Sequence, residues 1–395
     1  MLKIAKIIIT SENLPFLPLI INRIEQKGIK RVKFVLPFKL DKNDSVPSLM
    51  EAAPNIAIIK NYVQKKGIEI LSNQKIENNP YLPQDVDFFD TKTVELKINF
   101  QKYKNKPKFS VIIPTFNKKD SLKFVLNNFF NQKYPKSRYE IIVIDDGSND
   151  KTLESMKKIK PACNFKYFYW SRKKIKLKDD LKKWAEFYNR VGLARNIGIE
   201  HAQGDIILFN DADILVTKDC LKKHEVYHKK YSNVVVRGFR MFLPLPNKFK
   251  PSIKKLSNFK CLNRISHPEK NKREKKMHCR LHDLSQEGWQ RIVTADLSIR
   301  KKYLEEVGGF SHDFVSWGFE DVDLGYRLSK LDMRLMWDDK IKVYHLYHKR
   351  EAGGELKDLL AFWVGTNILY RKYLDEKIYH VYRDVIMYKL DNLML

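Results

Sequence analysis

The hydrophobic pattern is most regular between residues 109 and 214, where short apolar runs alternate with amphipathic stretches. The apolar runs have the length of buried strands and end in polar turn residues; they lie at 109–117, 139–150, 164–170 and 205–214. Residues 118–131 have apolar positions at helical spacing, and a second helix is predicted over 191–204, ending at Gly204. Strands that alternate with helices predict an α/β fold, with a mostly parallel sheet flanked by helices on both faces.

The pattern is weaker on either side of this region. Residues 1–106 predict a small N-terminal α/β unit of unknown role, joined by a basic linker at 101–108, and they carry no catalytic pattern. Residues 244–286 form a basic loop, in which 12 Lys or Arg but only two Glu lie between Lys248 and Arg280. A loop of this length is typical of a lid or of a disordered segment. Residues 351–395 predict a C-terminal helical extension.

Composition narrows the partners and the compartment. The chain has 395 residues, with 75 Lys and Arg against 47 Asp and Glu, so its net charge of +28 favours nucleotide phosphates, nucleic acid or an acidic membrane face. The four cysteines are far apart, which excludes a disulfide scaffold and fits a reducing cytoplasm. No apolar stretch approaches the roughly 20 residues that span a bilayer. The N-terminus predicts a strand and a helix start, not a signal peptide.

Polar residues gather where three of the predicted strands end. Asn117 follows the first strand, Asp145 and Asp146 end the second, and Asp211 and Asp213 follow the fourth. The carboxyl ends of parallel strands meet at one edge of the sheet, which is where such sheets bind ligands. This convergence predicts the functional site.

The Asp211-Ala212-Asp213 sequence predicts a divalent cation site, because alternate strand residues point the same way and oxygen ligands suit Mn²⁺ or Mg²⁺. The competing interpretation is a solvated pair at a strand end. For Asp145 and Asp146, one carboxylate is expected to bind a base or ribose and the other to cap the following Gly-Ser turn.

Arg195 offers a fork of donors for a base carbonyl or a phosphate, and the alternative is a surface salt bridge. In the stretch 317–321, Gly318 allows a tight turn beside a ligand and Trp317 offers a flat face for a sugar ring. A carboxylate at the following helix start, Glu320 or Asp321, is placed to take a proton from a hydroxyl nucleophile. Helix-start acids and a core tryptophan are the alternative explanation.

Two histidines, His345 and His348, lie near a strand end, where a neutral imidazole can complete the coordination of Mn²⁺. At least one of them is expected to be an ordinary core histidine. A zinc site in the basic loop is disfavoured, because its spacing matches no standard finger; its candidates are Cys261, His267, His278, Cys279 and His282.

Taken in order, the motifs resemble a GT-A fold glycosyltransferase of the family 2 type with a galactosyltransferase-type C-terminal region (the WG-x-ED motif). The resemblance covers roughly three fifths of the chain and rests on the residues at 110–118, 141–150, 192–199, 204–213 and 308–328. It implies a glycosyltransferase domain over 107–350, with a nucleotide-sugar half at 107–215 and an acceptor half at 216–350.

The resemblance also implies a role for each matching residue. The nucleotide-sugar contacts would be Pro114, Thr115, Asn117, Asp145, Asp146, Arg195, Asp211 and Ala212. Asp211 and Asp213 would bind Mn²⁺ or Mg²⁺ with His345 as the third protein ligand and His348 as its rival. Asp321 would be the general base, and Trp317, Gly318 and Glu320 would hold the acceptor. Phe319 stands where the motif often has Gly, so a bulky ring is expected to narrow or reshape the acceptor site.

The function implied is an inverting, metal-dependent transfer of sugar from a nucleotide-sugar, commonly a UDP-sugar, to a hydroxyl of a glycan or lipid-linked glycan in surface polysaccharide synthesis. The basic charge would then favour peripheral contact with an anionic inner membrane face, which flotation with anionic liposomes at rising salt tests. A nucleotidyltransferase is disfavoured because the first strand ends in PTFN and not in a Gly-rich signature. The other alternative is a protein without transfer activity, either a degenerate GT-A protein or a basic protein that binds nucleic acid or an anionic surface, but no nucleic-acid-binding signature is present.

Overall fold

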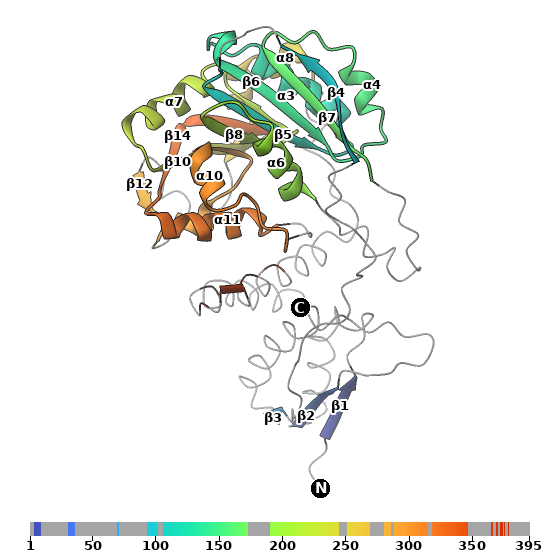
Figure 1. Ribbon diagram of the computed structural model, residues 1–395, viewed down its shortest axis with the longest axis vertical. Coiled ribbons are helices and arrows are strands. Elements are labelled where there is room, and N and C mark those ends of the chain that lie inside the picture. Colours follow the sequence, from blue (N-terminus) through green and yellow to red (C-terminus); the bar gives the residue numbers. More distant parts are fainter. Residues whose placement is uncertain are drawn as a thin grey trace.

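The computed structural model describes most of the region that carries the motifs (Figure 1). The described residues are 4–8, 31–35, 69–70, 93–101, 106–172, 190–244, 251–268, 280–285, 288–314, 318–346, and the single positions 365, 369, 372, 373, 375 and 378. Trp317, His348, His278 and Cys279 therefore lie outside the described residues, and so do the N-terminal helices predicted from the sequence.

A parallel set of strands forms the first half of the large sheet, as predicted. The strands are β5 (Phe109–Thr115), β6 (Tyr139–Asp145), β7 (Asn164–Trp170) and β8 (Ile206–Asn210). They lie in the order β8-β5-β6-β7, each parallel to its neighbours. Every residue of β5, β6 and β8 is buried, which explains why these strands read as continuous apolar runs.

The second half of the sheet is mixed. Its strands are β9 (Ile214–Val216), β10 (Val234–Phe242), β11 (His267–Pro268), β12 (Arg280–Asp283), β13 (Asp296–Arg300) and β14 (Arg334–His345). β13 runs antiparallel to both β8 and β10, while β10 is parallel to β14. β9 pairs antiparallel with the end of β14. The sheet is therefore mixed as a whole, with a continuous parallel part in the first half and one parallel pair, β10 and β14, in the second.

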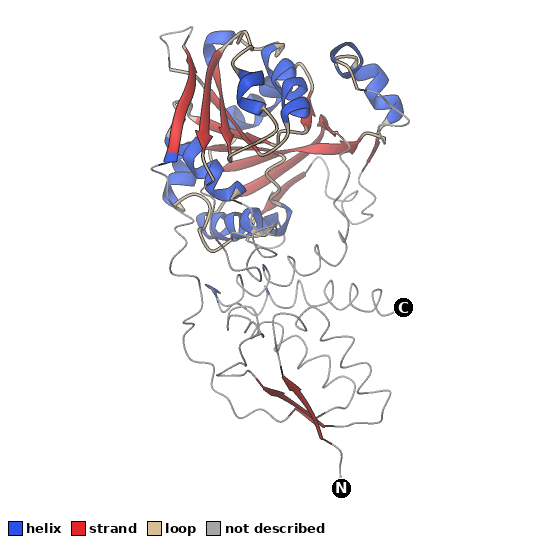
Figure 2. Cartoon of the chain, turned by 90° about the vertical axis from the view of Figure 1, so that its right-hand side faces the viewer, coloured by secondary structure: helices blue, strands red, loops and turns tan. Residues whose placement is uncertain are grey.

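Helices cover both faces of this sheet, as Figure 2 shows. One face packs against α3 (Lys119–Phe130) and α7 (Cys220–Lys230). The other packs against α6 (Val191–Glu200), α10 (Lys301–Glu306) and α11 (Glu320–Leu328). The alternation of strand side chains divides the core accordingly: Val111 faces the first layer, and Ile112 faces the second.

Short elements complete the described chain. They are α4 (Thr152–Met156), α8 (Ile253–Leu256), α9 (Phe259–Ile265) and the 3₁₀ turns Lys136–Arg138, Gly288–Arg291 and Ser329–Leu331. The predicted basic loop at 244–286 thus contains two helices and two strands within its described part. None of the helices in the described ranges has both the length and the apolar character needed to span a membrane.

The predicted boundary at residue 106 needs correction, because β4 (Val94–Phe100) lies before it and belongs to the large sheet. β4 pairs antiparallel with β7 and extends that edge. Near the N-terminus, β1 (Ile4–Ile8), β2 (Arg31–Val35) and β3 (Glu69–Ile70) form a separate parallel sheet, in keeping with the α/β unit predicted there. At the C-terminus, five of the six described positions are helical.

Candidate active site

The ends of β5, β6 and β8 meet at one edge of the sheet, as the sequence predicts. Thr115 and Asp145 are register partners at the ends of β5 and β6, and Asp211 directly follows β8. The Asp146 N–H donates to the Thr115 carbonyl over 2.8 Å, which joins the turns after the two strands. The hydroxyl of Thr115 is buried and has no partner among the described residues. Polar groups from separate strands therefore converge here.

Asp145 and Asp146 are both bound within the protein. Asp145 is fully buried; it accepts the Ser148 N–H at 2.8 Å and the hydroxyl of Tyr167. It thus takes the predicted turn-capping role, and burial raises the pKa of this carboxyl. Asp146 accepts from Arg190 Nε at 2.6 Å and pairs with Arg172. The predicted contact of either carboxylate with a base stays a prediction.

The loop after β5 is tied to the loop after β6 through Asn117. Its N–H donates to Ser148 Oγ at 2.8 Å, and its Oδ1 accepts the Asn149 N–H at 2.9 Å. Asn117 has φ of 51°, a left-handed conformation that Asn tolerates better than most residues. Pro114, which was predicted to contact the nucleotide, is buried within β5. These hydrogen bonds therefore hold the two loops together beside the site.

Asp213 and His345 lie together although they are far apart in the sequence. Ile214 of β9 pairs with His345 of β14, and the Leu346 N–H donates to the Asp213 carbonyl at 2.9 Å. The His345 Nε2 atom is consequently 3.8 Å from Asp213 Oδ1. On the other side, Lys118 Nζ donates to Asp213 Oδ2 at 3.1 Å. His345 is thus placed beside Asp213, and its rival His348 lies outside the described residues.

The residues around Asp213 fit a divalent cation. A carboxylate and an imidazole nitrogen at 3.8 Å are a suitable first pair of ligands for Mn²⁺. Asp211 offers a further carboxylate whose side chain is 36% exposed, while Ala212 between them is buried. The ammonium of Lys118 shows that the carboxylate of Asp213 already attracts a cation. The structure thus brings Asp213 and His345 together, whereas among the described residues the ligand atoms of Asp211, Asp213 and His345 do not all lie within 4.8 Å of one another, so Asp211 as a third ligand stays a prediction.

Arg195 is not a surface salt bridge but the centre of a buried one. The side chain is 3% exposed, and its two terminal nitrogens donate to Asp211 Oδ1 and to Glu320 Oε1, each at 3.0 Å. Its Nε and the second oxygen of Glu320 are buried without a partner among the described residues. One guanidinium thus joins the aspartate pair after β8 to the first residue of α11.

α11 begins with the two predicted acids. Glu320 is buried, and Asp321 is half-buried with its Oδ1 accepting the Val322 N–H at 2.9 Å. Burial and the negative charge of Glu320 raise the pKa of Asp321 to about 7, whereas Arg195 opposes the shift. A carboxylate with a pKa near neutrality is suited to accept a proton at physiological pH.

The ring of Phe319 is buried, and its predicted effect on the acceptor site stays a prediction. Phe319 is 4% exposed, and a Cβ placed on Gly365 would lie 2.3 Å from its Cδ2. The ring is therefore covered by the C-terminal segment. Phe319 nevertheless has φ of 71°, a conformation that favours glycine, which explains why the motif often has Gly there. The position is therefore conformationally demanding.

Contacts from the C-terminal segment fix α11, and sequence reasoning missed them. Tyr373 Oη donates to Asp323 Oδ1 at 2.7 Å, Tyr326 Oη donates to Asp375 Oδ2 at 2.8 Å, and the two tyrosine rings are 4.4 Å apart. Burial and the hydrogen bond to Asp323 raise the pKa of Tyr373. A tyrosine-rich helix pattern near the C-terminus was the only sequence signal, and it did not say what the helix contacts.

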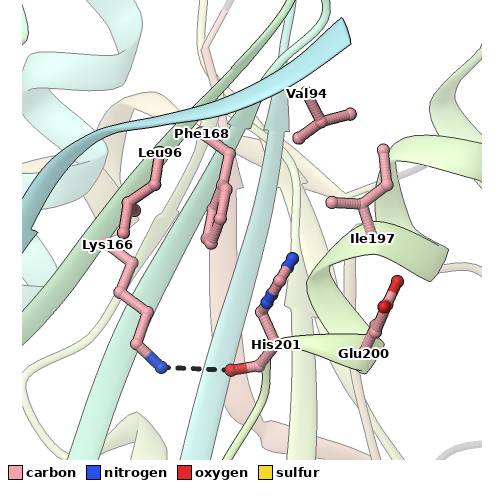
Figure 3. Close-up of a pocket in the computed structure, with 7 residues that line it drawn as sticks. All are labelled: Val94, Leu96, Lys166, Phe168, Ile197, Glu200 and His201. Carbon is pink, nitrogen blue, oxygen red and sulfur yellow. Dashed lines mark hydrogen bonds between the residues drawn. The ribbon is translucent and has the colours of Figure 1, made fainter. Parts of the chain in front are cut away.

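A surface pocket lies elsewhere, between β4, β7 and the end of α6 (Figure 3). Phe168 stacks on His201 there with ring centroids 4.3 Å apart, and Lys166 Nζ donates to the His201 carbonyl at 3.1 Å. None of the predicted site residues lines this pocket; its lining is Val94, Leu96, Lys166, Phe168, Ile197, Glu200 and His201. The predicted chemistry therefore lies at the strand ends and not in this pocket.

Comparison with known proteins gives two adjoining family matches. Residues 110–286 match the model of "Glycosyl transferase family 2", and residues 275–349 match the model described as "N-terminal domain of galactosyltransferase". The matched ranges contain all of the strand-end residues and the start of α11.

Curated relatives carry glycosyltransferase names. An uncharacterized glycosyltransferase, YfnE of Bacillus subtilis, is 26% identical over 61% of this chain and 65% of its own length. The poly(ribitol-phosphate) beta-N-acetylglucosaminyltransferase TarS of Staphylococcus aureus is 33% identical over 29% of this chain and 18% of its own. The chain thus spans less than two thirds of these relatives. A crystal structure of TarS residues 1–349 with UDP-GlcNAc superposes at a TM-score of 0.47 and 18% identity, covering 72% of each chain.

Proposed function

Because the chain is a GT-A glycosyltransferase of the family 2 type, we propose that it transfers a sugar from a nucleotide-sugar donor to a hydroxyl of a glycan or lipid-linked glycan acceptor. UDP-sugars are the donors to test first, in view of the resemblance of the strand-end motifs. The named relatives that act on glycan or polyol-phosphate polymers, TarS and the chondroitin synthase of Pasteurella multocida, support a role in polysaccharide synthesis.

The observation that carries the proposal is the chain of charged groups across the site. It runs from His345 and Asp213 through Asp211 and Arg195 to Glu320, and Asp321 is the next residue of α11. One end offers ligands for the cation that nucleotide diphosphates require, and the other offers a base. A transferase needs both functions in one site, because its donor and acceptor must meet.

In the proposed reaction, Asp321 accepts the proton of the acceptor hydroxyl. The acceptor oxygen then forms a bond to the anomeric carbon of the sugar, while the bond from that carbon to the diphosphate oxygen breaks. Attack from the side opposite the leaving group inverts the anomeric configuration. Arg195 holds Glu320 in place beside Asp321, and the half-buried setting of the base limits the access of water, which would hydrolyse the donor.

Asp211, Asp213 and His345 would hold a divalent cation. When bound, this cation would neutralise the negative charge that develops on the departing nucleoside diphosphate. The fit rests on the paired oxygen and nitrogen donors of Asp213 and His345 and on the cation already attracted to Asp213. Mn²⁺ and Mg²⁺ are both compatible with this donor set.

The donor site is tested by a thermal-shift panel of UDP, GDP, CDP and common UDP-sugars, with and without Mn²⁺. A ligand that binds only the folded state increases the free energy of unfolding, by about 2.7 kcal/mol when its concentration is a hundred times its Kd. The unfolding midpoint rises as a result. We expect a metal-dependent shift with UDP or one UDP-sugar that is lost in Asp213→Ala and kept in Asp120→Ala, whose side chain is 80% exposed. If no nucleotide changes the midpoint, the proposed donor site is contradicted, and a binding protein without transfer activity is favoured.

Lys118 should compete with the metal for Asp213. Its ammonium is 3.1 Å from Asp213 Oδ2, and a partly exposed pair of this kind is worth about 0.2–1 kcal/mol. Lys118→Met is therefore expected to tighten Mn²⁺ binding by roughly 1.4- to 5-fold, measured by paramagnetic resonance titration of free Mn²⁺. Lys119→Met is the neighbouring control and should leave the affinity unchanged. Weaker Mn²⁺ binding in Lys118→Met would contradict competition between the two cations.

The acceptor and the place of action remain proposals. Contact with an anionic membrane face is supported by the net charge of +28 and would bring the enzyme to lipid-linked acceptors. Acceptor identity is not carried over from any relative, because the matched regions cover only part of their lengths.

A further inference from the structure

A second cluster of metal-ligating side chains lies beneath α7, apart from the candidate active site. Cys220 and His224 are one turn apart on the inner face of α7, and Asp296 begins β13 opposite them. Their ligand atoms all lie within 4.8 Å of one another. The three residues are 0%, 0% and 2% exposed. The proposed transfer reaction uses none of them.

The spacing of the donor atoms matches a tetrahedral metal. Cys220 Sγ lies 3.8 Å from Asp296 Oδ1, and His224 Nε2 lies 3.3 Å from Asp296 Oδ2. In a tetrahedral zinc site with bonds of about 2.0–2.3 Å, neighbouring ligand atoms are separated by roughly 3.3–3.7 Å. Each residue offers one ligand atom, so the three residues supply a sulfur, a nitrogen and an oxygen, and a buried water would take the fourth position.

The buried charge of Asp296 also calls for a cation. Its only ion pair among the described residues is the one with His224, and no Lys or Arg of those residues pairs with it. A buried carboxylate without a cationic partner is strongly disfavoured. Gly238 on β10 leaves room for the Asp296 carboxylate, because a Cβ at this position would lie 2.3 Å from Asp296 Oδ2. A divalent cation between the three side chains would supply the missing charge.

The surroundings of His224 are those of a metal ligand. Its other ring nitrogen, Nδ1, is 2.8 Å from Ser298 Oγ, and the same oxygen is 2.7 Å from His228 Nε2. Burial lowers the pKa of His228 well below its usual range, so this imidazole stays neutral and can accept the Ser298 hydroxyl proton. Ser298 then accepts the Nδ1 proton of His224, which leaves the lone pair of Nε2 directed at the cluster. A hydrogen bond of this kind orients metal-bound histidines.

We propose that Cys220, His224 and Asp296 bind a zinc ion that fastens α7 to β13. All three ligands are buried and lie on two packed elements, so we assign the ion a role in stability. Binding would release the thiol proton of Cys220 as the zinc–sulfur bond forms, with no change of redox state. The competing state is a hydrogen-bonded cluster without metal, in which His224 Nε2 and the thiol both donate to Asp296.

Zinc content of the full-length chain tests the proposal. The protein is treated with EDTA, mixed with an equimolar amount of Zn²⁺, passed through a gel-filtration column and assayed by plasma mass spectrometry. We expect wild type and Asp213→Ala to retain zinc equally, which separates this site from the donor site. Cys220→Ser should lower retained zinc by about tenfold or more, and Cys261→Ser, at a half-exposed thiol outside the cluster, should leave it unchanged.

Cobalt substitution keeps the proposal falsifiable if Cys220→Ser fails to fold. Wild type loaded with Co²⁺ should show a thiolate-to-cobalt charge-transfer band and the strong visible absorption of tetrahedral cobalt. Wild type that retains no zinc and shows no such band would overturn the proposal and leave a hydrogen-bonded cluster. Zinc retained equally by a folded Cys220→Ser variant would also overturn it. Neither measurement uses a nucleotide-sugar, so failure here leaves the proposed function untouched.

Discussion

Asp321→Asn should lower kcat/KM for sugar transfer by about 10²- to 10⁴-fold, the usual contribution of a general base. An amide cannot accept the hydroxyl proton, but it keeps the shape of the side chain and the hydrogen bond from the Val322 N–H. The measurement is the initial rate of transfer with the donor identified by the binding panel. Asp120→Asn, at a carboxylate 80% exposed on α3, is the matched control and should transfer at the wild-type rate.

The pH profile of the wild type gives a second readout for the same residue. Because the pKa of Asp321 is raised to about 7, the carboxylate is protonated below neutrality, and kcat/KM should rise with pH and level off above pH 7. A flat profile between pH 5.5 and 8.5, with full activity in Asp321→Asn, would exclude the base role.

Stability has the opposite pH dependence at this residue. A carboxyl whose pKa is raised by folding contributes stability below its ordinary pKa, and that contribution is lost as the pH rises through the folded value. The amide of Asp321→Asn does not ionise, so the variant does not lose this stability as the pH rises. Above pH 7 its unfolding midpoint should therefore be at least as high as that of the wild type. Lost activity with retained stability would distinguish a catalytic defect from a folding defect.

The parallel half of the site was predictable because its residues depend on local pattern. A continuous apolar run followed by turn residues predicts a buried strand, and parallel strands must deliver their ends to one edge. Thr115, Asp145 and Asp211 therefore came together as expected. The same reasoning failed for β4, because its exposed alternate residues on an edge strand resemble a linker more than a core strand.

Contacts between distant segments were not predictable from the same pattern. His345 reaches Asp213 only because β14 pairs with β9, and nothing near either residue encodes that pairing. The Phe319 ring packs against Gly365, which lies outside the residue ranges that match the two family models. Arg195 was recognised as important, but its two carboxylate partners come from separate elements. Sequence reasoning thus identified the residues and missed their connections.

Arg195→Met is expected to destabilise the protein by about 3–5 kcal/mol, the cost of breaking a buried ion pair from one side. The substitution leaves the carboxylate of Glu320, which is 6% exposed, without its cation. Chemical denaturation measures the loss. Arg138→Met is the matched control, since that side chain is 51% exposed and 3.8 Å from Glu225, and it should change stability by at most about 1 kcal/mol.

A double variant separates the charge effect from lost packing. If the cost arises from the uncompensated carboxylate, adding Glu320→Gln to Arg195→Met should recover part of the stability, so the two changes should not be additive. If the cost is packing of the guanidinium against Phe310, whose ring centroid is 5.4 Å away, the double variant should remain as unstable as the single one. Equal stability of Arg195→Met and Arg138→Met would contradict the buried network altogether.

Arg195 should also affect the reaction through Asp321, because its charge lowers the pKa of that carboxyl against the effect of burial. In any folded Arg195→Met protein, the rise of kcat/KM with pH should therefore move above pH 7. Loss of fold alone cannot move a pH midpoint, so this readout separates positioning from stability. The same guanidinium binds Asp211, and a change at the metal ligands would reach the base through it. Donor and acceptor groups are thus coupled by one buried charge.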